Sequence, residues 1–194
     1  MDRPHYWPEA KEIHLKLVYE ASSCRVLGLQ AAGPGEVAKR VDTATQLIAR
    51  EATVDDFVHL EHAYAPPYAP AMEPLAVVAM AAQNEEDGIA SVSPGVPWEG
   101  SAVLDVRSRQ EVENEPASHD RLTHIPLDEL AGRLGELEDS VCCVVCERGT
   151  RSAEAVRLLL RHGIRARYLG GGLHWRGSMD KAGESRCAGR VAGS

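Results

Sequence analysis

The chain has 194 residues, 44% of them hydrophobic, which suits one large or two small globular domains. Its formal net charge of −8 argues against a nucleic-acid surface, which needs a basic patch. The longest apolar stretch, 75–82, is too short to span a bilayer, and the N-terminal residues lack the apolar core of a signal peptide. Five cysteines without disulfide-framework spacing indicate a reducing compartment, so we expect a cytoplasmic protein.

The first half of the chain alternates between strand and helix patterns. Period-2 alternation predicts strands over 13–19 and 26–32, joined by a turn at 21–23. Helical spacing predicts helices over 36–50, 54–61 and 73–84, the second after an N-cap at Thr53 and the third with a proline in its first turn. A strand hairpin followed by helices predicts an α+β domain over 1–84.

Two of these helices differ in how their apolar residues are distributed. In 36–50, Val37, Val41, Ala44 and Ile48 recur at helical spacing and predict the buried face, while Arg40 is expected on the surface. The helix over 73–84 is apolar on nearly every face, more than so small a domain can bury alone. We therefore expect this domain to self-associate, with a homodimer as the usual symmetric outcome.

The middle of the chain changes composition. Residues 85–97 are first acidic and then rich in Gly, Ser and Pro, with no apolar period, so we predict a linker. A second domain is expected over 98–178 and a mobile tail over 179–194. Within that domain, the β-branched run 141–145 predicts a buried parallel strand, and 152–162 predicts a helix.

Cys146 lies between this strand and this helix, where open α/β sheets usually hold their ligands. Loop amides and the helix dipole favour an anion there, and the thiolate form of cysteine is the nucleophile. The alternative is a buried, inert thiol. Cys142 and Cys143 are better explained as core residues of the strand, and a metal site with Cys146 would need ligands on both of its faces.

The loop Cys146-Glu147-Arg148-Gly149-Thr150-Arg151 resembles the active-site loop of rhodaneses, Cys-x-x-Gly-x-Arg. Other parts of the chain are similar to the same family in the same order. Residues 103–107 followed by Glu111 resemble its first strand with Asp-x-Arg, 124–127 its second strand, and 169–172 with Trp175 its closing Leu-x-Gly-Gly and Trp. The resemblance implies a doubly wound parallel-sheet domain.

The resemblance also implies roles for individual residues. Rhodaneses carry sulfane sulfur on the cysteine as a persulfide, which makes Cys146 the expected catalytic residue. Glu147, Arg148, Gly149, Thr150, Arg151 and Ser152 would form the substrate-binding loop, with Asp105 and Arg107 as structural support. Arg151 is either a solvated charge at the helix start or the residue that closes the loop through a salt bridge, for which Asp105 is the candidate partner. Arg148 at the loop tip is either a surface arginine or the recognition group for an anionic donor.

Residues 16–84 resemble the dimerisation domain of pyridine nucleotide-disulfide oxidoreductases. The matching residues include Tyr64-Ala65-Pro66-Pro67-Tyr68, the version found in coenzyme A-disulfide reductases and NADH oxidases. In such enzymes Tyr64, Pro66, Pro67 and Tyr68 would line the active site of the neighbouring subunit. Ala65 replaces a proton-donating histidine of other relatives, so that role is not transferred.

Some coenzyme A-disulfide reductases continue from this domain into a rhodanese domain. No Gly-x-Gly-x-x-Gly follows a predicted strand, so we expect no cofactor in this chain itself. FAD, NAD(P)H and coenzyme A are implied only for a full-length parent. The chain is then either a piece of such an enzyme or a stand-alone remnant.

These expectations combine into a two-domain α/β protein that acts as a rhodanese-type sulfurtransferase. Its partners would be small sulfane-sulfur donors, thiol acceptors and a second copy of the chain, with no nucleic acid, membrane or metal. One alternative is a cysteine phosphatase, which would need a longer loop than the four residues that separate Cys146 from Arg151. The other is a non-catalytic dimerisation and interaction module.

Overall fold

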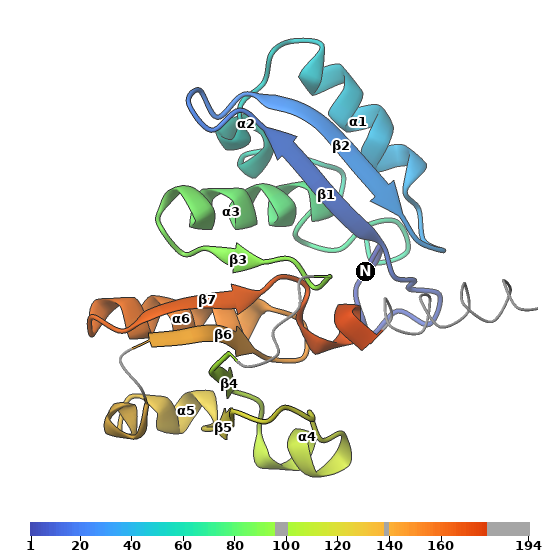
Figure 1. Cartoon of the computed structure of the whole chain (residues 1–194). Coiled ribbons are helices and arrows are strands. Elements are labelled where there is room, and N and C mark those ends of the chain that lie inside the picture. Colours follow the sequence, from blue (N-terminus) through green and yellow to red (C-terminus); the bar gives the residue numbers. More distant parts are fainter. Residues whose placement is uncertain (96–100, 138–139, 178–194) are drawn as a thin grey trace, which may run out of the picture. The chain divides into compact units, whose positions relative to one another are not determined.

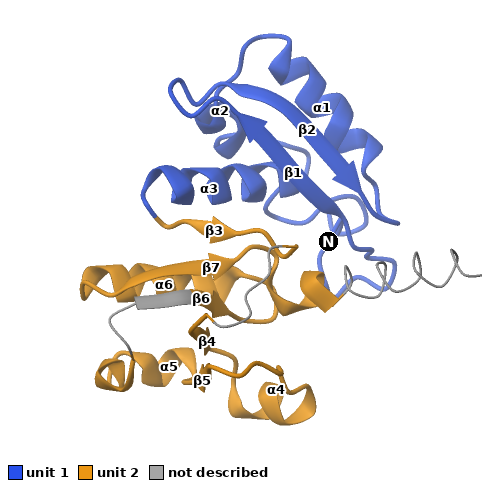
Figure 2. Ribbon diagram, in the orientation of Figure 1, with its two compact units in different colours: residues 1–88 blue, residues 89–194 orange. Residues whose placement is uncertain are grey.

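The computed structural model describes residues 1–95, 101–137 and 140–177, without the side chains of 140–142. The tail predicted over 179–194 and the predicted start of the second domain at residue 98 lie outside this description. The chain divides into two compact units, Met1–Gly88 and Ile89–Ser194 (Figure 2). No helix in the described ranges is long and apolar enough to cross a bilayer.

Unit 1 is built on an antiparallel hairpin of β1 (His14–Tyr19) and β2 (Val26–Ala32) (Figure 1). The register shifts between Val18 and Tyr19, which leaves Leu27 as an extra residue beside Gly28. Three helices follow, α1 (Ala38–Ile48), α2 (Val54–Val58) and α3 (Pro74–Glu86). Their apolar side chains and those of the hairpin form one core, which includes the fully buried Phe57.

The ends of these helices follow from local residues. Thr53 caps α2 and forms a reciprocal capping box with Asp56. Pro74 occupies the first turn of α3, where the missing amide hydrogen costs no helical bond. Leu75 and Ala79 of α3 are buried, whereas Val77 is 47% exposed, so part of its apolar surface remains uncovered within unit 1.

Arg40 contradicts the surface position predicted for it. Its side chain is fully buried and donates to the Glu73 carboxylate at 2.8 Å. It also donates to the carbonyl oxygens of Glu36 and Asp2. Val41, predicted on the buried face, is 38% exposed. The helix is rotated relative to the apolar prediction because an ion pair satisfies the buried guanidinium, which hydrophobic spacing cannot reveal.

Unit 2 is organised around a parallel five-stranded sheet with the order β3-β7-β6-β4-β5. Its strands are β3 (Ser91–Val92), β4 (Val103–Asp105), β5 (Leu122–His124), β6 (Ser140–Val145) and β7 (Arg165–Leu169). Its helices are α4 (Arg109–Asn114), α5 (Leu127–Leu130), the 3-10 turn η1 (Leu134–Glu136), α6 (Thr150–Arg161) and a helical segment over 172–177. The predicted α/β fold class is confirmed.

The predicted linker contains part of this sheet. Ser91 and Val92 pair with Tyr168 and Leu169 as the edge strand β3. The pairing brings together residues more than seventy positions apart, and the two-residue strand has no sequence periodicity of its own to predict it.

The sheet separates two apolar layers. On one face, Leu104, Val144 and Ile125 pack against Val156 and Leu159 of α6. The other face includes Val103, Cys143, Val145 and Leu169, with Leu173 packed against them. The central strand β6 is therefore buried on both sides and ends at Val145, directly before Cys146.

Candidate active site

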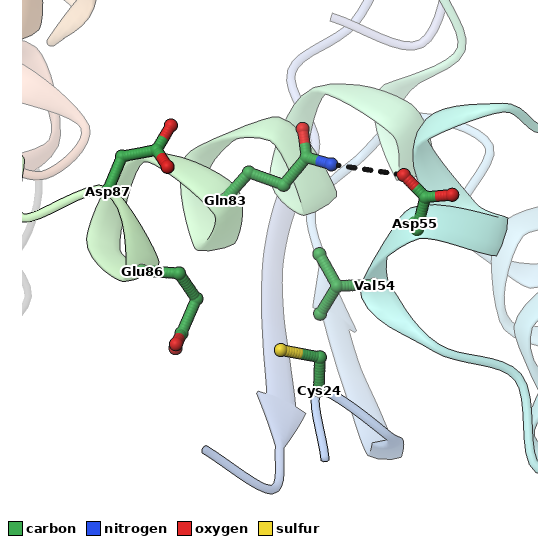
Figure 3. A pocket seen from close by; sticks show the side chains of 6 residues that line it. All are labelled: Cys24, Val54, Asp55, Gln83, Glu86 and Asp87. Atoms are coloured by element: carbon green, nitrogen blue, oxygen red, sulfur yellow. Dashed lines mark hydrogen bonds between the residues drawn. The ribbon is translucent and has the colours of Figure 1, made fainter. Parts of the chain in front are cut away.

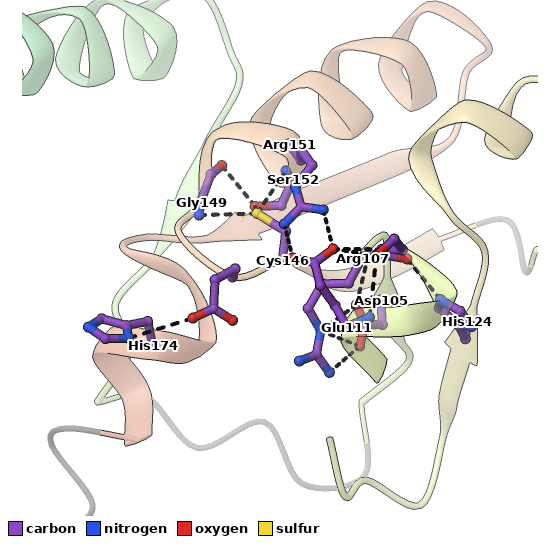
Figure 4. Close-up of polar contacts among 11 residues, drawn as sticks. Asp105, Arg107, Glu111, His124, Cys146, Gly149, Arg151, Ser152 and His174 are labelled. Carbon is purple, nitrogen blue, oxygen red and sulfur yellow. Dashed lines mark hydrogen bonds and ion pairs between the residues drawn. The ribbon is translucent and has the colours of Figure 1, made fainter. Parts of the chain in front are cut away.

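Cys146 is fully buried at the point where β6 leaves the sheet (Figure 4). Its Sγ accepts a hydrogen bond from the Gly149 amide at 3.1 Å and a longer one from the Ser152 amide at 3.4 Å. The Sγ also lies 3.5 Å from the Ser152 hydroxyl oxygen. Amide hydrogens aimed at one sulfur from the start of a helix stabilise negative charge on it.

The loop folds over the sulfur because of its glycine. Gly149 has φ +95°, a left-handed conformation that other residues rarely adopt, and α6 begins at the next residue. A side chain there would also crowd the Gly171 amide at 3.2 Å. The Ser152 hydroxyl donates to the Gly149 carbonyl at 2.9 Å and holds the turn from within.

The closing glycines support the loop from the other side. A Cβ on Gly172, which has φ +72°, would collide with the Glu147 carbonyl, so the two backbones touch directly. The amides of Leu173 and His174 donate to the carbonyls of Cys146 and Glu147 at 2.9 and 3.1 Å. The start of the segment 172–177 thus anchors the backbone that carries the cysteine.

Arg151 closes the loop, but with a different partner from the predicted one. Both of its terminal nitrogens donate to Glu111 on α4, each at 2.6 Å. The hydrogen bonds from Arg151 lower the pKa of Glu111 to about 2, and the same pair raises the pKa of Arg151. The prediction that Asp105 is the partner is wrong, because Asp105 is already engaged by Arg107.

Asp105 and Arg107 form a buried pair below the loop. The Arg107 Nε and Nη2 donate to the Asp105 carboxylate at 2.8–3.1 Å, and both side chains are almost completely excluded from solvent. The Arg107 carbonyl lies 2.9 Å from His124 Nε2, and since a carbonyl only accepts, that nitrogen carries the proton. The contact between His124 and the Arg107 carbonyl ties the end of β5 to the segment that follows β4.

The remaining loop residues differ in exposure. Arg148 and Thr150 are exposed, whereas Glu147 is half-buried. The Glu147 carboxylate lies 3.6 Å from His174 Nδ1, so its charge is directed toward the segment 172–177. Arg148 therefore presents a cation at the loop surface while the neighbouring acid has a charged or polar partner of its own.

The predicted interface residues belong to unit 1, whereas Cys146 belongs to unit 2. Tyr64 and Tyr68 are 51% and 68% exposed, and Pro66 and Pro67 are half-buried between them. Unit 1 also has a shallow hollow lined by Cys24, Gln83 and several acidic residues, with Gln83 donating to Asp55 at 3.4 Å (Figure 3). In the described part of the chain, no three His, Cys, Asp or Glu side chains are grouped so as to hold a metal ion.

Three contacts at the candidate site were not predicted from the sequence. The sequence predicts Glu111 only as part of a motif, and its spacing three residues after Ser108 is typical of a capping-box acid in the first turn of α4. His174 and the hydroxyl of Ser152 had no sequence signal, since their roles come from contacts made on folding.

Residues 1–76 match the family model described as pyridine nucleotide-disulphide oxidoreductase, dimerisation domain. Over 77 residues the chain is 44% identical to the NAD(P)H sulfur oxidoreductase (CoA-dependent) of Pyrococcus abyssi, which covers 40% of this chain and 17% of the relative. Over 64 residues it is 36% identical to a coenzyme A disulfide reductase of Staphylococcus aureus, covering 33% of this chain and 15% of the relative.

Two solved structures match nearly the whole chain. The reduced Bacillus anthracis CoADR-RHD gives a TM-score of 0.80 with 31% identity, over 91% of this chain and 32% of the other. A NAD-dependent persulfide reductase from A. fulgidus gives a TM-score of 0.79 with 40% identity, over 89% of this chain and 32% of the other. The chain therefore spans about a third of these two proteins.

The sequence-based resemblance is confirmed by these matches. Residues 1–76 carry the pyridine nucleotide-disulphide oxidoreductase dimerisation domain, and about nine tenths of the chain is similar in sequence and fold to part of a CoADR-RHD protein and of a NAD-dependent persulfide reductase.

Proposed function

We propose that the chain is a rhodanese-type sulfurtransferase that carries sulfane sulfur as a persulfide on Cys146. The observation that carries the proposal is the convergence of the Gly149 and Ser152 amides on the buried Cys146 sulfur. These donors stabilise the thiolate before reaction, and the adjacent loop amides are available to the outer sulfur afterwards.

The chemistry balances in two displacement steps. The Cys146 thiolate attacks the terminal sulfur of a donor, a new S–S bond forms, and the donor fragment leaves with the electron pair of its broken bond. An acceptor thiolate then attacks the outer sulfur, which passes to the acceptor while Cys146 leaves as a thiolate. No net oxidant or reductant is consumed.

Full burial of Cys146 favours small sulfur donors over bulkier groups. The sulfur lies beneath a loop with only four residues between Cys146 and Arg151. In this loop the amides of Gly149 and Ser152 bond to the sulfur itself, which suits a reaction whose charge is located on sulfur. A phosphatase would instead need donors arranged around a phosphoryl group, so an aryl phosphate tested beside thiosulfate would separate the two activities.

The decisive experiment is intact mass after exposure to thiosulfate or polysulfide, with and without reductant. Wild type should gain one reducible sulfur atom, and Cys146→Ser should gain none. Cys143→Ala is the matched control because Cys143 lies buried on the same strand but faces the apolar layer with Val103 and Leu169. It should lose stability and still accept sulfur. Loading of the Cys146→Ser protein at wild-type level would overturn the proposal.

We place this activity within a longer reductase. The similar proteins are a coenzyme A-dependent NAD(P)H sulfur oxidoreductase and a coenzyme A disulfide reductase. In such a parent, FAD and NAD(P)H would be held by domains outside this chain, and the persulfide on Cys146 would be passed to or from a coenzyme A thiol. Unit 1 would pair two copies and present Tyr64, Pro66, Pro67 and Tyr68 to the partner's reductase site.

The non-catalytic alternative has its own signature. If the chain served only dimerisation, it would self-associate and yet fail to gain sulfur from thiosulfate, polysulfide or a coenzyme A persulfide. The organised donors around Cys146 have no evident purpose in such a module.

A further inference from the structure

We propose that the side-chain hydroxyl of Ser152 is a catalytic hydrogen-bond donor that switches between the Gly149 carbonyl and the Cys146 sulfur. The proposal rests on the proposed sulfur transfer and deepens it. It concerns the hydroxyl alone and is separate from the Ser152 amide, which any residue at that position would supply.

The geometry provides two acceptors for one hydroxyl hydrogen. The Ser152 Oγ lies 2.9 Å from the Gly149 carbonyl oxygen, to which it donates, and 3.5 Å from Cys146 Sγ (Figure 4). In the thiol state the S–H donates to Oγ, and the O–H continues the chain to the carbonyl. Ser152 and Cys146 are both fully buried, so the hydroxyl and the sulfur interact with each other directly.

Ionisation of the cysteine reverses the first link of this chain. A thiolate has no hydrogen to donate and becomes an acceptor only. The Ser152 hydroxyl can then rotate about its C–O bond and donate to the sulfur, as a third donor beside the Gly149 and Ser152 amides. A charge-assisted hydrogen bond replaces a neutral one, which favours the rotation.

The Gly149 carbonyl keeps a hydrogen bond after the hydroxyl has turned away from it. The Gly149 carbonyl also accepts the amide of Ala153 at 3.0 Å, as part of the first turn of α6. It therefore keeps a partner when the hydroxyl turns away, and the switch does not leave a buried polar atom unsatisfied.

The switch assists the step in which sulfur leaves the protein. In the persulfide the negative charge is on the outer sulfur, so the inner Cys146 sulfur is a poor acceptor and the hydroxyl returns to the Gly149 carbonyl. When an acceptor thiolate attacks the outer sulfur, the S–S bond breaks and its electron pair remains on Cys146 Sγ. The Ser152 hydroxyl donates to this developing thiolate and stabilises the leaving group.

Other charged groups near the sulfur keep their positions in this scheme. Arg151 faces it from the first turn of α6 and is paired with Glu111 of α4. Glu147 of the loop is paired with His174 of the segment 172–177, and Arg107 with Asp105 at the end of β4. A change confined to the Ser152 hydroxyl leaves these three pairs in place.

The test compares Ser152→Ala with wild type in two independent assays. In the first, persulfide-loaded protein is mixed with an acceptor thiol, and the single-turnover rate of sulfur release should fall about tenfold, as for one lost charge-assisted hydrogen bond. In the second, alkylation of Cys146 by iodoacetamide is followed against pH by tandem mass spectrometry, and its midpoint should move to higher pH.

Controls separate the hydroxyl's chemistry from its local structural role. Thr45→Ala in α1 removes a hydroxyl that also donates to a backbone carbonyl within a helix, at 2.8 Å, but lies in unit 1. It should change neither assay. Ser152→Thr restores a hydroxyl and should recover the alkylation midpoint even if its extra methyl slows sulfur release. Ser152→Gly is a second hydroxyl-free variant, and thermal unfolding monitors the fold of each.

The outcomes distinguish this proposal from the function on which it rests. If wild type never loads sulfur, the proposed function fails, while the alkylation profile still reports on the hydroxyl. If wild type loads sulfur and Ser152→Ala matches it in both release rate and alkylation midpoint, the switch is wrong. Equal slowing at every pH, with an unchanged midpoint, would show that the hydroxyl only holds the turn.

Discussion

Both units contain an arginine that holds two segments together, and the two arginines differ in their exposure to solvent. In unit 1, Arg40 is fully buried and bonds to Glu73 and to two backbone carbonyls. In unit 2, the side chains of Arg151 and Glu111 remain 36% and 34% exposed although their contacts are shorter. The Arg40–Glu73 pair is excluded from solvent and stabilises the fold, whereas the Arg151–Glu111 pair lies partly exposed at the edge of the Cys146 loop.

This difference indicates separate tasks for the two units. A buried pair is costly to break because the remaining charge cannot return to water. A half-exposed bidentate pair contributes less to stability but orients the groups beside it. We therefore expect damage in unit 1 to appear as lost stability or assembly, and damage around Cys146 to appear as lost chemistry.

The largest effect on stability is expected from Arg40→Met, which leaves Glu73 buried without its cation. The free energy of unfolding should fall by about 3–5 kcal/mol, measured by urea unfolding followed by circular dichroism. Arg25→Met is the matched control, since Arg25 pairs with Glu51 at the surface of the same unit and should cost about 1 kcal/mol or less. Equal losses in the two variants would show that burial is not what distinguishes Arg40.

Glu111→Gln should weaken the loop in a pH-dependent manner. The pKa of Glu111 is lowered from 4.5 to about 2 by its bonds to Arg151, so the folded state favours the charged form. Its contribution to stability is therefore fully present above pH 4.5 and is lost as the pH falls toward 2. Acid unfolding curves of wild type and variant should differ at neutral pH and converge in that window.

Glu113→Gln on the same helix is the control for Glu111. Glu113 is exposed, and its substitution should leave both the acid unfolding curve and sulfur loading unchanged. Glu111→Gln should also slow loading, because Arg151 loses the carboxylate that orients it. If the acid unfolding curves of wild type and Glu111→Gln instead converge only above pH 4.5, another group supplies the acid sensitivity.

A smaller effect is expected from Val77→Asp in unit 1. Val77 is 47% exposed on α3, on a helix whose opposite side is buried, and we predict that it lies in a contact between two copies. A charge there should weaken self-association in a sedimentation-velocity concentration series and leave sulfur loading intact. Leu27→Asp, on another exposed apolar residue of unit 1, tests whether any such substitution has the same effect.

The smallest effect is expected from Arg148→Ala, because Arg148 is exposed and its charge is partly screened. KM for thiosulfate should rise by a few fold, equivalent to about 1 kcal/mol, since one charge-assisted contact to the anion is lost. Alkylation by neutral iodoacetamide should hardly change. Equal losses with charged and neutral reagents would show that Arg148 shapes the loop and does not recognise the donor.

Features with a local signal were predicted well from the sequence. The hairpin strands over 13–19 and 26–32 and the Thr53 cap of α2 follow from alternation and capping residues, and the structure contains them. The run 141–145, the loop at Cys146 and the helix after it are also contiguous in the chain. The conformation of each of these segments depends on residues close to it in the chain, so periodicity and a short motif were sufficient to predict it.

Features that depend on distant partners were decided only by the tertiary structure. Arg40 is buried because Glu73 lies 33 residues away to receive it, and Arg151 bonds to Glu111, 40 residues away, and not to Asp105. The edge strand β3 exists only through its pairing with β7, and the Ser152 hydroxyl meets the Cys146 sulfur only when the loop has closed. The sequence by itself determined most of the helices and strands and pointed to Cys146 as the candidate nucleophile, because these depend on local conformation. The tertiary structure selected the partners, because each charged side chain pairs with whichever opposite group packing brings within hydrogen-bonding distance.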